Sequence, residues 1–266
     1  MDRKDGRTVA RNNEVRILRA LHRFGWMRTK DIGALVWQRW ASTARVDGPS
    51  LQPPVTTESG LRMAQRTLRR MRHGRLVLSS QAPDGSIVYA LSEAGARALQ
   101  GIGVPAITGK DQVRSFSSSH FRHRCIANEV AISAILEGYR ASTEREISQG
   151  LWLGGKQGIA GKLPDVFLHN GSTAFWVEVE RSRKRNNDQA RLQGALEAFR
   201  QDALRPTGSV LLGDKLSWTK VVFICTPAFR SKLCRDLEAV GWSKKDIANL
   251  LKFEISLYQF KDIAFS

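Results

Sequence analysis

The sequence predicts a mixed α/β protein of two domains, and three observations lead to this prediction. The first hundred residues combine the apolar spacing of amphipathic helices with one short hairpin pattern. Residues 163–168 and 174–180 are rich in strand formers and flank an Asn-Gly pair, which is a strong hairpin signal. Residues 101–119 are rich in Gly and Ser. We therefore expect domains at 1–100 and 120–266, joined by a linker at 101–119.

The composition favours a polyanionic partner. The 266 residues include 42 Lys and Arg against 25 acids, a formal net charge of +17. Residues 1–100 alone carry a net charge of +10. Nucleic acid is the first candidate for such a partner, and an anionic membrane surface is the second.

Cysteine usage and hydropathy predict a cytoplasmic protein. The three cysteines show neither metal-site spacing nor pairing, and the polar N-terminus does not look like a secretory signal. Both features are typical of a reducing compartment. The longest apolar runs are too short to span a bilayer, so we expect no membrane association.

Two helices are expected at the start of the first domain. Asn12 or Asn13 is suited to cap a helix that ends near Phe24, where a glycine follows. Thr29 is suited to cap a second helix that ends near Trp37. In both segments the apolar residues recur at helical spacing, which predicts one buried face per helix.

A third helix is expected from Thr57 to about Arg72, with Gly74 placed to end it. Its polar side is dense in arginine, and the positive charge continues just past its end. The side chains concerned are Arg62, Arg66, Arg69, Arg70, Arg72 and Arg75. On a single amphipathic helix such a face is most often only a solvated surface.

The segment that follows changes this interpretation. Residues 75–79 and 87–91 form a hairpin pattern around a turn at 83–86, and Ser92 is suited to cap a last helix. Helix, helix, basic helix, hairpin, helix is the order of a winged helix-turn-helix. The arginine-rich helix then stands where a recognition helix enters the major groove. We expect the six arginines to bind double-stranded DNA, with protein docking as the alternative.

The second domain is expected to follow an α-β-β-β-α-β order with further elements after it. The expected elements are a helix at 121–139, strands at 143–148, 163–169 and 174–181, a helix at 187–204, a strand at 221–225 and a helix from 228.

Three carboxylates interrupt the apolar strands, namely Asp165, Glu178 and Glu180. Burying an ionised carboxylate is costly unless a metal ion, a basic partner or exposure at a strand end offsets the cost. Strand alternation places Glu178 and Glu180 on one face, and the hairpin brings Asp165 beside them. Three oxygen ligands suit Mg²⁺ or Mn²⁺. The alternative is pairing with nearby arginines, which are Arg181, Arg183 and Arg185.

This arrangement resembles the restriction-endonuclease-like superfamily, in which Pro-Asp and Glu-X-Lys motifs form the active site. Pro164-Asp165 matches the first motif and Glu178-Val179-Glu180 the second. The resemblance implies that Asp165, Glu178 and Glu180 hold Mg²⁺ or Mn²⁺ in a catalytic site. Glu180 stands where the family has its lysine, so a competent site needs a substitute, for which Lys184 is the candidate.

The whole pattern over residues 12–205 also resembles the replication-relaxation family, which includes MobC-like mobilisation accessory proteins of plasmids and integrative elements. The residues that carry this resemblance are His123, Asn128-Glu129 and the run from Leu163 to Lys184. It implies a DNA-binding accessory protein of mobilisation or replication, with a relaxase or replication protein as partner. The alternatives are a metal-dependent DNA endonuclease or nickase using the acidic cluster, and a transcriptional regulator. A homodimer is left open.

Overall fold

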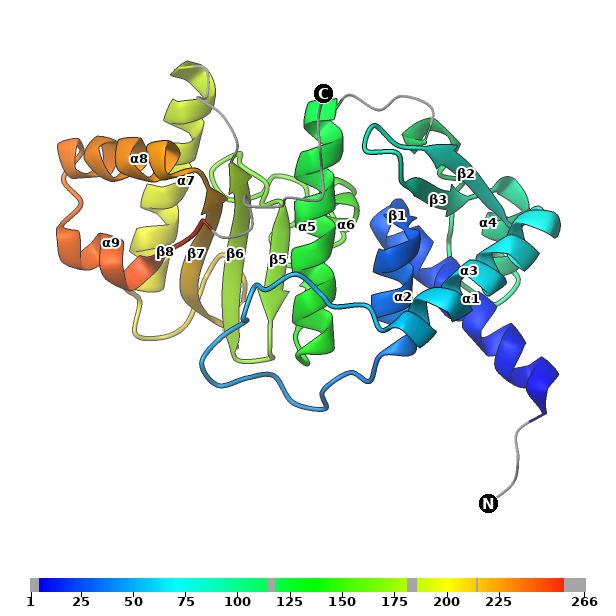
Figure 1. Cartoon of the computed structure of the whole chain (residues 1–266). Coiled ribbons are helices and arrows are strands. Elements are labelled where there is room, and N and C mark those ends of the chain that lie inside the picture. Colours follow the sequence, from blue (N-terminus) through cyan, green and yellow to red (C-terminus); the bar gives the residue numbers. More distant parts are fainter. Residues whose placement is uncertain (1–4, 114–117, 181–185, 214, 256–266) are drawn as a thin grey trace. The chain divides into compact units, whose positions relative to one another are not determined.

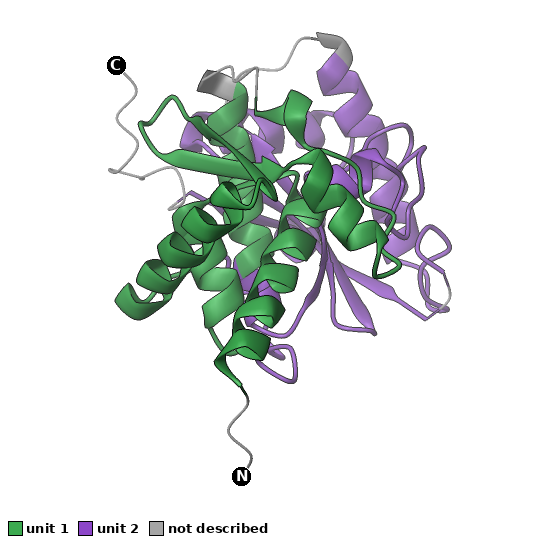
Figure 2. Ribbon diagram, turned by 90° about the vertical axis from the view of Figure 1, so that its right-hand side faces the viewer, with its two compact units in different colours: residues 1–40, 54–132, 263–266 green, residues 41–53, 133–262 purple. Residues whose placement is uncertain are grey.

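The computed structural model describes residues 5–113, 118–180, 186–213 and 215–255. The chain is mixed α/β, with a three-stranded antiparallel sheet and a five-stranded mixed sheet (Figure 1). Within the described residues, one compact unit comprises 5–40 and 54–132, and the other comprises 41–53 and 133–255 (Figure 2). This division differs from the expected boundary at residues 100–119.

The helices of the first unit are α1 (Gly6–Phe24), α2 (Thr29–Trp37), α3 (Glu58–His73) and α4 (Glu93–Gln100). The α1 helix begins earlier than expected, because the side chain of Asp5 caps it by accepting a hydrogen bond from Arg7 N. Asn12 and Asn13 lie within the helix, so their expected capping role is wrong. The predicted start of α3 is confirmed, since Thr57 Oγ1 accepts from Gly60 N at 3.1 Å.

The three-stranded sheet contains β1 (Trp26–Arg28), β2 (Val77–Gln81) and β3 (Ile87–Leu91) in the order β1-β3-β2. The β2–β3 hairpin and its turn agree with the sequence pattern, whereas β1 was not expected. Ser92 caps α4 as predicted, with its hydroxyl accepting from Gly95 N at 3.0 Å.

Residues 104–113 belong to the first unit rather than to a free linker. Ala106 is fully buried, and Val113 packs in a cluster with Trp26. The backbone N–H of Gly109 donates to Leu91 O at 2.9 Å. A side chain at Gly109 would lie 2.8 Å from the Cβ of Ala90, so the segment packs tightly along β3. The expected Gly- and Ser-rich linker is therefore wrong for these residues, while 114–117 lie outside the described ranges.

The α5 helix (Ser118–Leu136) replaces the helix expected at 121–139, and the border between the units falls within it. Its first half makes polar contacts in the first unit. Arg124 Nη2 donates to Phe24 O at 2.9 Å, and Asn128 Nδ2 donates to Trp26 O at 3.1 Å. Because these bonds satisfy backbone carbonyls of the first unit, this part of α5 was wrongly assigned to the second domain.

The remaining elements are β4 (Arg140–Ser142), α6 (Glu144–Ser148), β5 (Val166–His169), β6 (Thr173–Glu180), α7 (Asn186–Ala203), β7 (Ser217–Cys225), α8 (Pro227–Ala239), α9 (Lys244–Leu250) and β8 (Leu251–Glu254). The strands form a sheet in the order β4-β5-β6-β7-β8, antiparallel from β4 to β6 and parallel from β6 to β8. The strand expected at 143–148 is wrong. Thr143 and Glu146 form a capping box there, which starts a short helix instead.

The β5–β6 hairpin positions the acidic residues. The Asn-Gly turn is confirmed, with Asn170 Oδ1 accepting from Thr173 N at 2.8 Å. Every residue of β6 after Thr173 is buried. Trp176 lies in one core cluster with Phe199 of α7 and Phe223 of β7. Glu178 and Glu180 therefore lie in a strand whose neighbours exclude water.

Candidate nucleic-acid interface and acidic cluster

The six predicted DNA-binding side chains are all exposed, namely Arg62, Arg66, Arg69, Arg70, Arg72 and Arg75. The opposite face of α3 is buried and includes Ala64, Leu68 and Met71. Arg70 Nε lies 2.7 Å from Glu14 Oε1 of α1, and Arg62 lies 3.7 Å from Glu58. The other four arginines have no ion partner within the described residues. The exposed face of α3 thus offers uncompensated positive charge.

Arg75 has an unusual backbone. Its φ is +56°, in the left-handed region that glycine prefers, although the glycine expected to end α3 is the preceding residue. Arg75 and Arg72 line a pocket of about 390 Å³ beside the start of α4, together with Lys110. Sequence reasoning missed Lys110 because it assigned this residue to the linker. Glu93 lines the same pocket, so three cations and one acid leave it a net positive charge, which favours an anionic group such as a phosphate.

The β2–β3 hairpin contributes no positive charge, since residues 76–96 contain neither Lys nor Arg. Its turn carries Asp84, whose Oδ1 accepts from the backbone and hydroxyl of Ser86 at 3.0 and 2.6 Å. The basic surface of this region therefore belongs to α3 and the segment just after it.

Glu178 is the most enclosed of the three predicted acids, with a relative exposure of 1%. Its Oε2 lies 2.5 Å from Lys162 Nζ, and its Oε1 accepts from the Trp176 indole at 2.6 Å. Burial acts to lower the pKa of Lys162. The charge of Glu178, followed by those of Asp165 and Glu180, outweighs this effect and raises the pKa. All three acids therefore lie close enough to act on this one ammonium group.

Asp165 lies just before β5, next to the Val166–Val177 pair of the hairpin register. Its Oδ2 accepts from Val179 N at 2.7 Å, so the carboxylate satisfies a backbone donor of β6. Glu180, at 7% exposure, ends the same strand. The structure thus brings the three acids to one end of the β5–β6 hairpin.

Lys162 is the residue of the acidic cluster that the sequence does not indicate. The predicted substitute Lys184 and the alternative partners Arg181, Arg183 and Arg185 lie outside the described residues. Within the described ranges, no three His, Cys, Asp or Glu side chains are placed to hold a metal ion. As the side chains lie, Glu178 is satisfied by an indole and an ammonium group rather than presented as a free ligand.

A second buried charge cluster lies in the first unit. Arg28, at 2% exposure, donates from Nε and Nη2 to the two oxygens of Asp31, each at 2.9 Å. Its Nη2 also lies 2.5 Å from Glu129 Oε1 of α5. Lys30, which is half-exposed, lies 3.4 Å from the same oxygen. Burial raises the pKa of Glu129, and Arg28 opposes that rise. Apart from Lys30 the cluster is buried, and its ion pairs join Arg28 at the end of β1 to Asp31 of α2 and Glu129 of α5.

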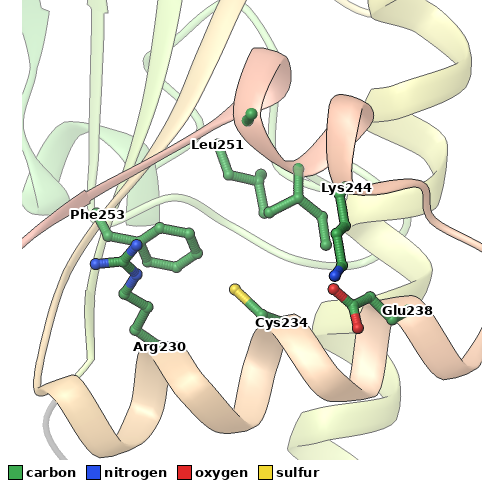
Figure 3. Close-up of a pocket in the computed structure, with 8 residues that line it drawn as sticks. Arg230, Cys234, Glu238, Lys244, Leu251 and Phe253 are labelled. Carbon is green, nitrogen blue, oxygen red and sulfur yellow. The ribbon is translucent and has the colours of Figure 1, made fainter.

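A pocket of about 320 Å³ lies between α8, α9 and β8 (Figure 3). The Arg230 guanidinium lies 5.5 Å from the centre of the Phe253 ring, and Cys234 lies between Arg230 and Glu238 along α8. Burial raises the pKa of the Cys234 thiol. Cations and an acid share this pocket, so its charge indicates no ligand class.

The comparisons with known proteins leave the site to be interpreted from its geometry. No protein-family model, curated protein or solved structure matches the chain. None of the helices in the described ranges combines the length and the apolarity that a bilayer crossing requires.

Proposed function

We propose that the first unit is a winged helix-turn-helix that binds double-stranded DNA through α3. The observation that carries this proposal is the exposed arginine face of α3, directly before the β2–β3 hairpin. In winged helices an element at this position lies in the major groove. Arg66 and Arg69 are the candidates for base contacts. Arg72, Arg75 and Lys110 would contact the phosphate backbone from the pocket beside α4.

The test is fluorescence anisotropy with the full chain and labelled duplex DNA over a series of salt concentrations. Arg66→Ala with Arg69→Ala should weaken binding by about 1–3 kcal/mol per base contact. Each lost phosphate contact should make the slope of log binding constant against log salt concentration less negative by about one. The matched control replaces Arg97 and Arg235, two exposed arginines elsewhere, and removes the same charge. If the control pair weakens DNA binding as much as the Arg66 and Arg69 pair, the binding is non-specific charge attraction and α3 is not the recognition helix.

We further propose that this DNA binding serves mobilisation or replication of a mobile element, with a relaxase or replication protein as partner. The support is the resemblance over residues 12–205 to the replication-relaxation family. The second unit would then be restriction-endonuclease-like, and its mixed sheet with the β5–β6 hairpin is compatible with that arrangement. Reconstitution with a relaxase and a plasmid that carries the transfer origin of that relaxase should raise nicking at the origin. Repression of a promoter without such an effect would favour a transcriptional regulator.

A second candidate function, a metal-dependent DNA endonuclease, is favoured by the position of Lys162. A lysine beside Asp165, Glu178 and Glu180 supplies the residue type that the Glu-X-Lys motif lacks here. Bound Mg²⁺ or Mn²⁺ would polarise a phosphate and activate water. The ion would require Glu178 to release its present partners, because both of its oxygens are engaged.

Plasmid nicking with Mn²⁺ tests this candidate. Lys162→Met and Glu178→Gln should each abolish cleavage, whereas Lys156→Met, an exposed lysine in the same segment, should leave it unchanged. Circular dichroism would establish that each variant is folded. Absence of cleavage by the wild type, or equal cleavage by Glu178→Gln, would remove the enzyme interpretation and leave the DNA-binding proposal intact.

A further inference from the structure

A small apolar pocket in the first unit has a rim of positive charge. Its volume is about 230 Å³, and it lies between α1, the end of α2 and the residues just after α2. Its walls are Ala20, Phe24, Leu35, Val36 and Trp40, and its rim carries Arg16, Arg19 and Arg23. The lining contains no acidic residue.

Trp40 gives this pocket an exposed aromatic wall. The side chain is 47% exposed, although tryptophan is normally highly buried. Its indole Nε1 donates to Leu35 O at 2.9 Å, which anchors the ring at the end of α2. An exposed apolar ring held in one orientation beside a cavity is typical of a binding surface rather than of a core.

The arginines add a matching charge. Arg16 and Arg19 are both exposed and have no ion partner within the described residues. They are three residues apart on α1, so they lie on neighbouring positions of one helix face. A ligand for this pocket should therefore carry negative charge around an apolar group.

We propose that this pocket binds a short acidic peptide segment of a partner protein, with one apolar side chain of that segment inserted beside Trp40. The apolar side chain would fill the space lined by Leu35 and Val36, and flanking carboxylates would pair with Arg16 and Arg19. Duplex DNA fits less well, because phosphates and sugars would leave the apolar walls unfilled. The proposal does not rest on DNA binding by α3.

The probe is a fluorescein-labelled peptide, Glu-Asp-Glu-Leu-Phe-Glu-Asp-Glu, titrated with the full chain. A second peptide with Ser in place of Leu and Phe keeps the charge and removes the anchor. The first peptide should bind about tenfold more tightly, as expected for burial of one apolar side chain. Equal binding of the two peptides, or no saturable binding of the first, would overturn the proposal.

Variants locate the binding surface. Trp40→Ala, and separately Arg16→Ala with Arg19→Ala, should each weaken peptide binding on the order of fivefold. The matched control, Arg7→Ala with Arg11→Ala, removes two exposed arginines of α1 outside the pocket and should leave binding unchanged. Equal weakening by the control pair would refute a defined site.

A single-stranded oligothymidylate provides the competing outcome, since bases stack on exposed aromatic rings. If Trp40→Ala abolishes oligonucleotide binding and leaves peptide binding unchanged, the pocket serves nucleic acid and the proposal fails. Arg66→Ala with Arg69→Ala should leave peptide binding unchanged, which separates this test from the DNA-binding proposal.

Discussion

Replacing Arg28 with Met should destabilise the first unit in a strongly pH-dependent way. Arg28 is the central cation of a buried cluster and contacts both Asp31 and Glu129. Methionine is apolar and long, so it keeps much of the packing volume while removing the charge. The substitution therefore isolates the electrostatic consequence of leaving two buried carboxylates without their main partner.

The expected loss of stability depends on which partners Asp31 and Glu129 keep after Arg28 is replaced. Removing one partner of a buried ion pair costs about 3–5 kcal/mol. Asp31 should contribute little of this, because it also accepts from Arg28 N in the capping box that starts α2. Among the residues that the structure describes, Glu129 then keeps only the half-exposed Lys30 as an ion partner, at 3.4 Å. We therefore expect about 3 kcal/mol at neutral pH, mostly from Glu129.

The sign of the pH dependence is fixed by Glu129. Burial already raises its pKa above the ordinary value of 4.5, and loss of Arg28 should raise it further. An acid whose pKa is higher in the folded state lowers the stability of the protein when it is ionised. This loss of stability is absent below pH 4.5, the ordinary pKa, and grows as the pH rises toward the folded pKa. The cost of Arg28→Met should therefore shrink by up to about 1.4 kcal/mol per unit as the pH falls.

Urea unfolding of the full chain at about pH 7.5 and about pH 5 measures this effect. Adding Glu129→Gln to Arg28→Met should recover about 2 kcal/mol at the higher pH. The control, Arg97→Met, changes an exposed arginine of the same unit and should cost less than about 0.5 kcal/mol. The reasoning is refuted by a cost below about 1 kcal/mol at pH 7.5, or by no recovery in the double variant.

Three further outcomes are expected. Arg75→Gly should raise stability by about 0.5–1 kcal/mol in urea unfolding, because it removes left-handed strain, and should weaken DNA binding by anisotropy. Lys162→Met should cost about 3 kcal/mol at neutral pH by removing the ammonium partner of the buried Glu178. Because the folded pKa of Lys162 is raised above 10.5, its contribution in the wild type is present below that value and lost as the pH rises through the folded pKa. Iodoacetamide at about pH 8 should label Cys234 before Cys225, whose pKa burial raises to about 12, and mass spectrometry would detect the reverse order.

Capping and turn residues correctly predicted the helix starts and the turn that their own side chains stabilise. Thr57, Ser92 and Asn170 each make the capping or turn hydrogen bond expected from its position. The short strand β1 could not be predicted this way, because three residues carry no periodicity and its pairing partner β3 lies some sixty residues later. The strand expected at 143–148 is overridden by the capping box of Thr143 and Glu146, two residues whose spacing is visible in the sequence.

Long-range contacts limited the prediction of the candidate sites. The exposure of the five arginines on α3 followed from helical spacing alone, whereas Arg75 lies just past the end of the helix. Lys162 lies in an irregular segment that has only an isolated bridge to Ile159, and no repeating pattern relates it to Glu178. Glu129 lies on a helix that the sequence places after a linker, yet its partner Arg28 is 101 residues earlier. Charge pairs between irregular or distant segments have no local sequence signature.

The acidic cluster can be explained in two ways that differ in one measurable respect. In the first, Lys162 and the Trp176 indole satisfy Glu178 for structural reasons, so the charge on Lys162 is what stabilises the hairpin. In the second, the carboxylates belong to a cation site, and a divalent ion can replace the missing ammonium group in Lys162→Met. Mass action would then restore stability as Mn²⁺ is added. Adding Glu178→Gln to Lys162→Met should abolish that recovery, because the amide removes the charged metal ligand and keeps the shape of the side chain. A recovery in Lys162→Met alone would therefore identify a metal site, and no recovery would identify a buried ion pair.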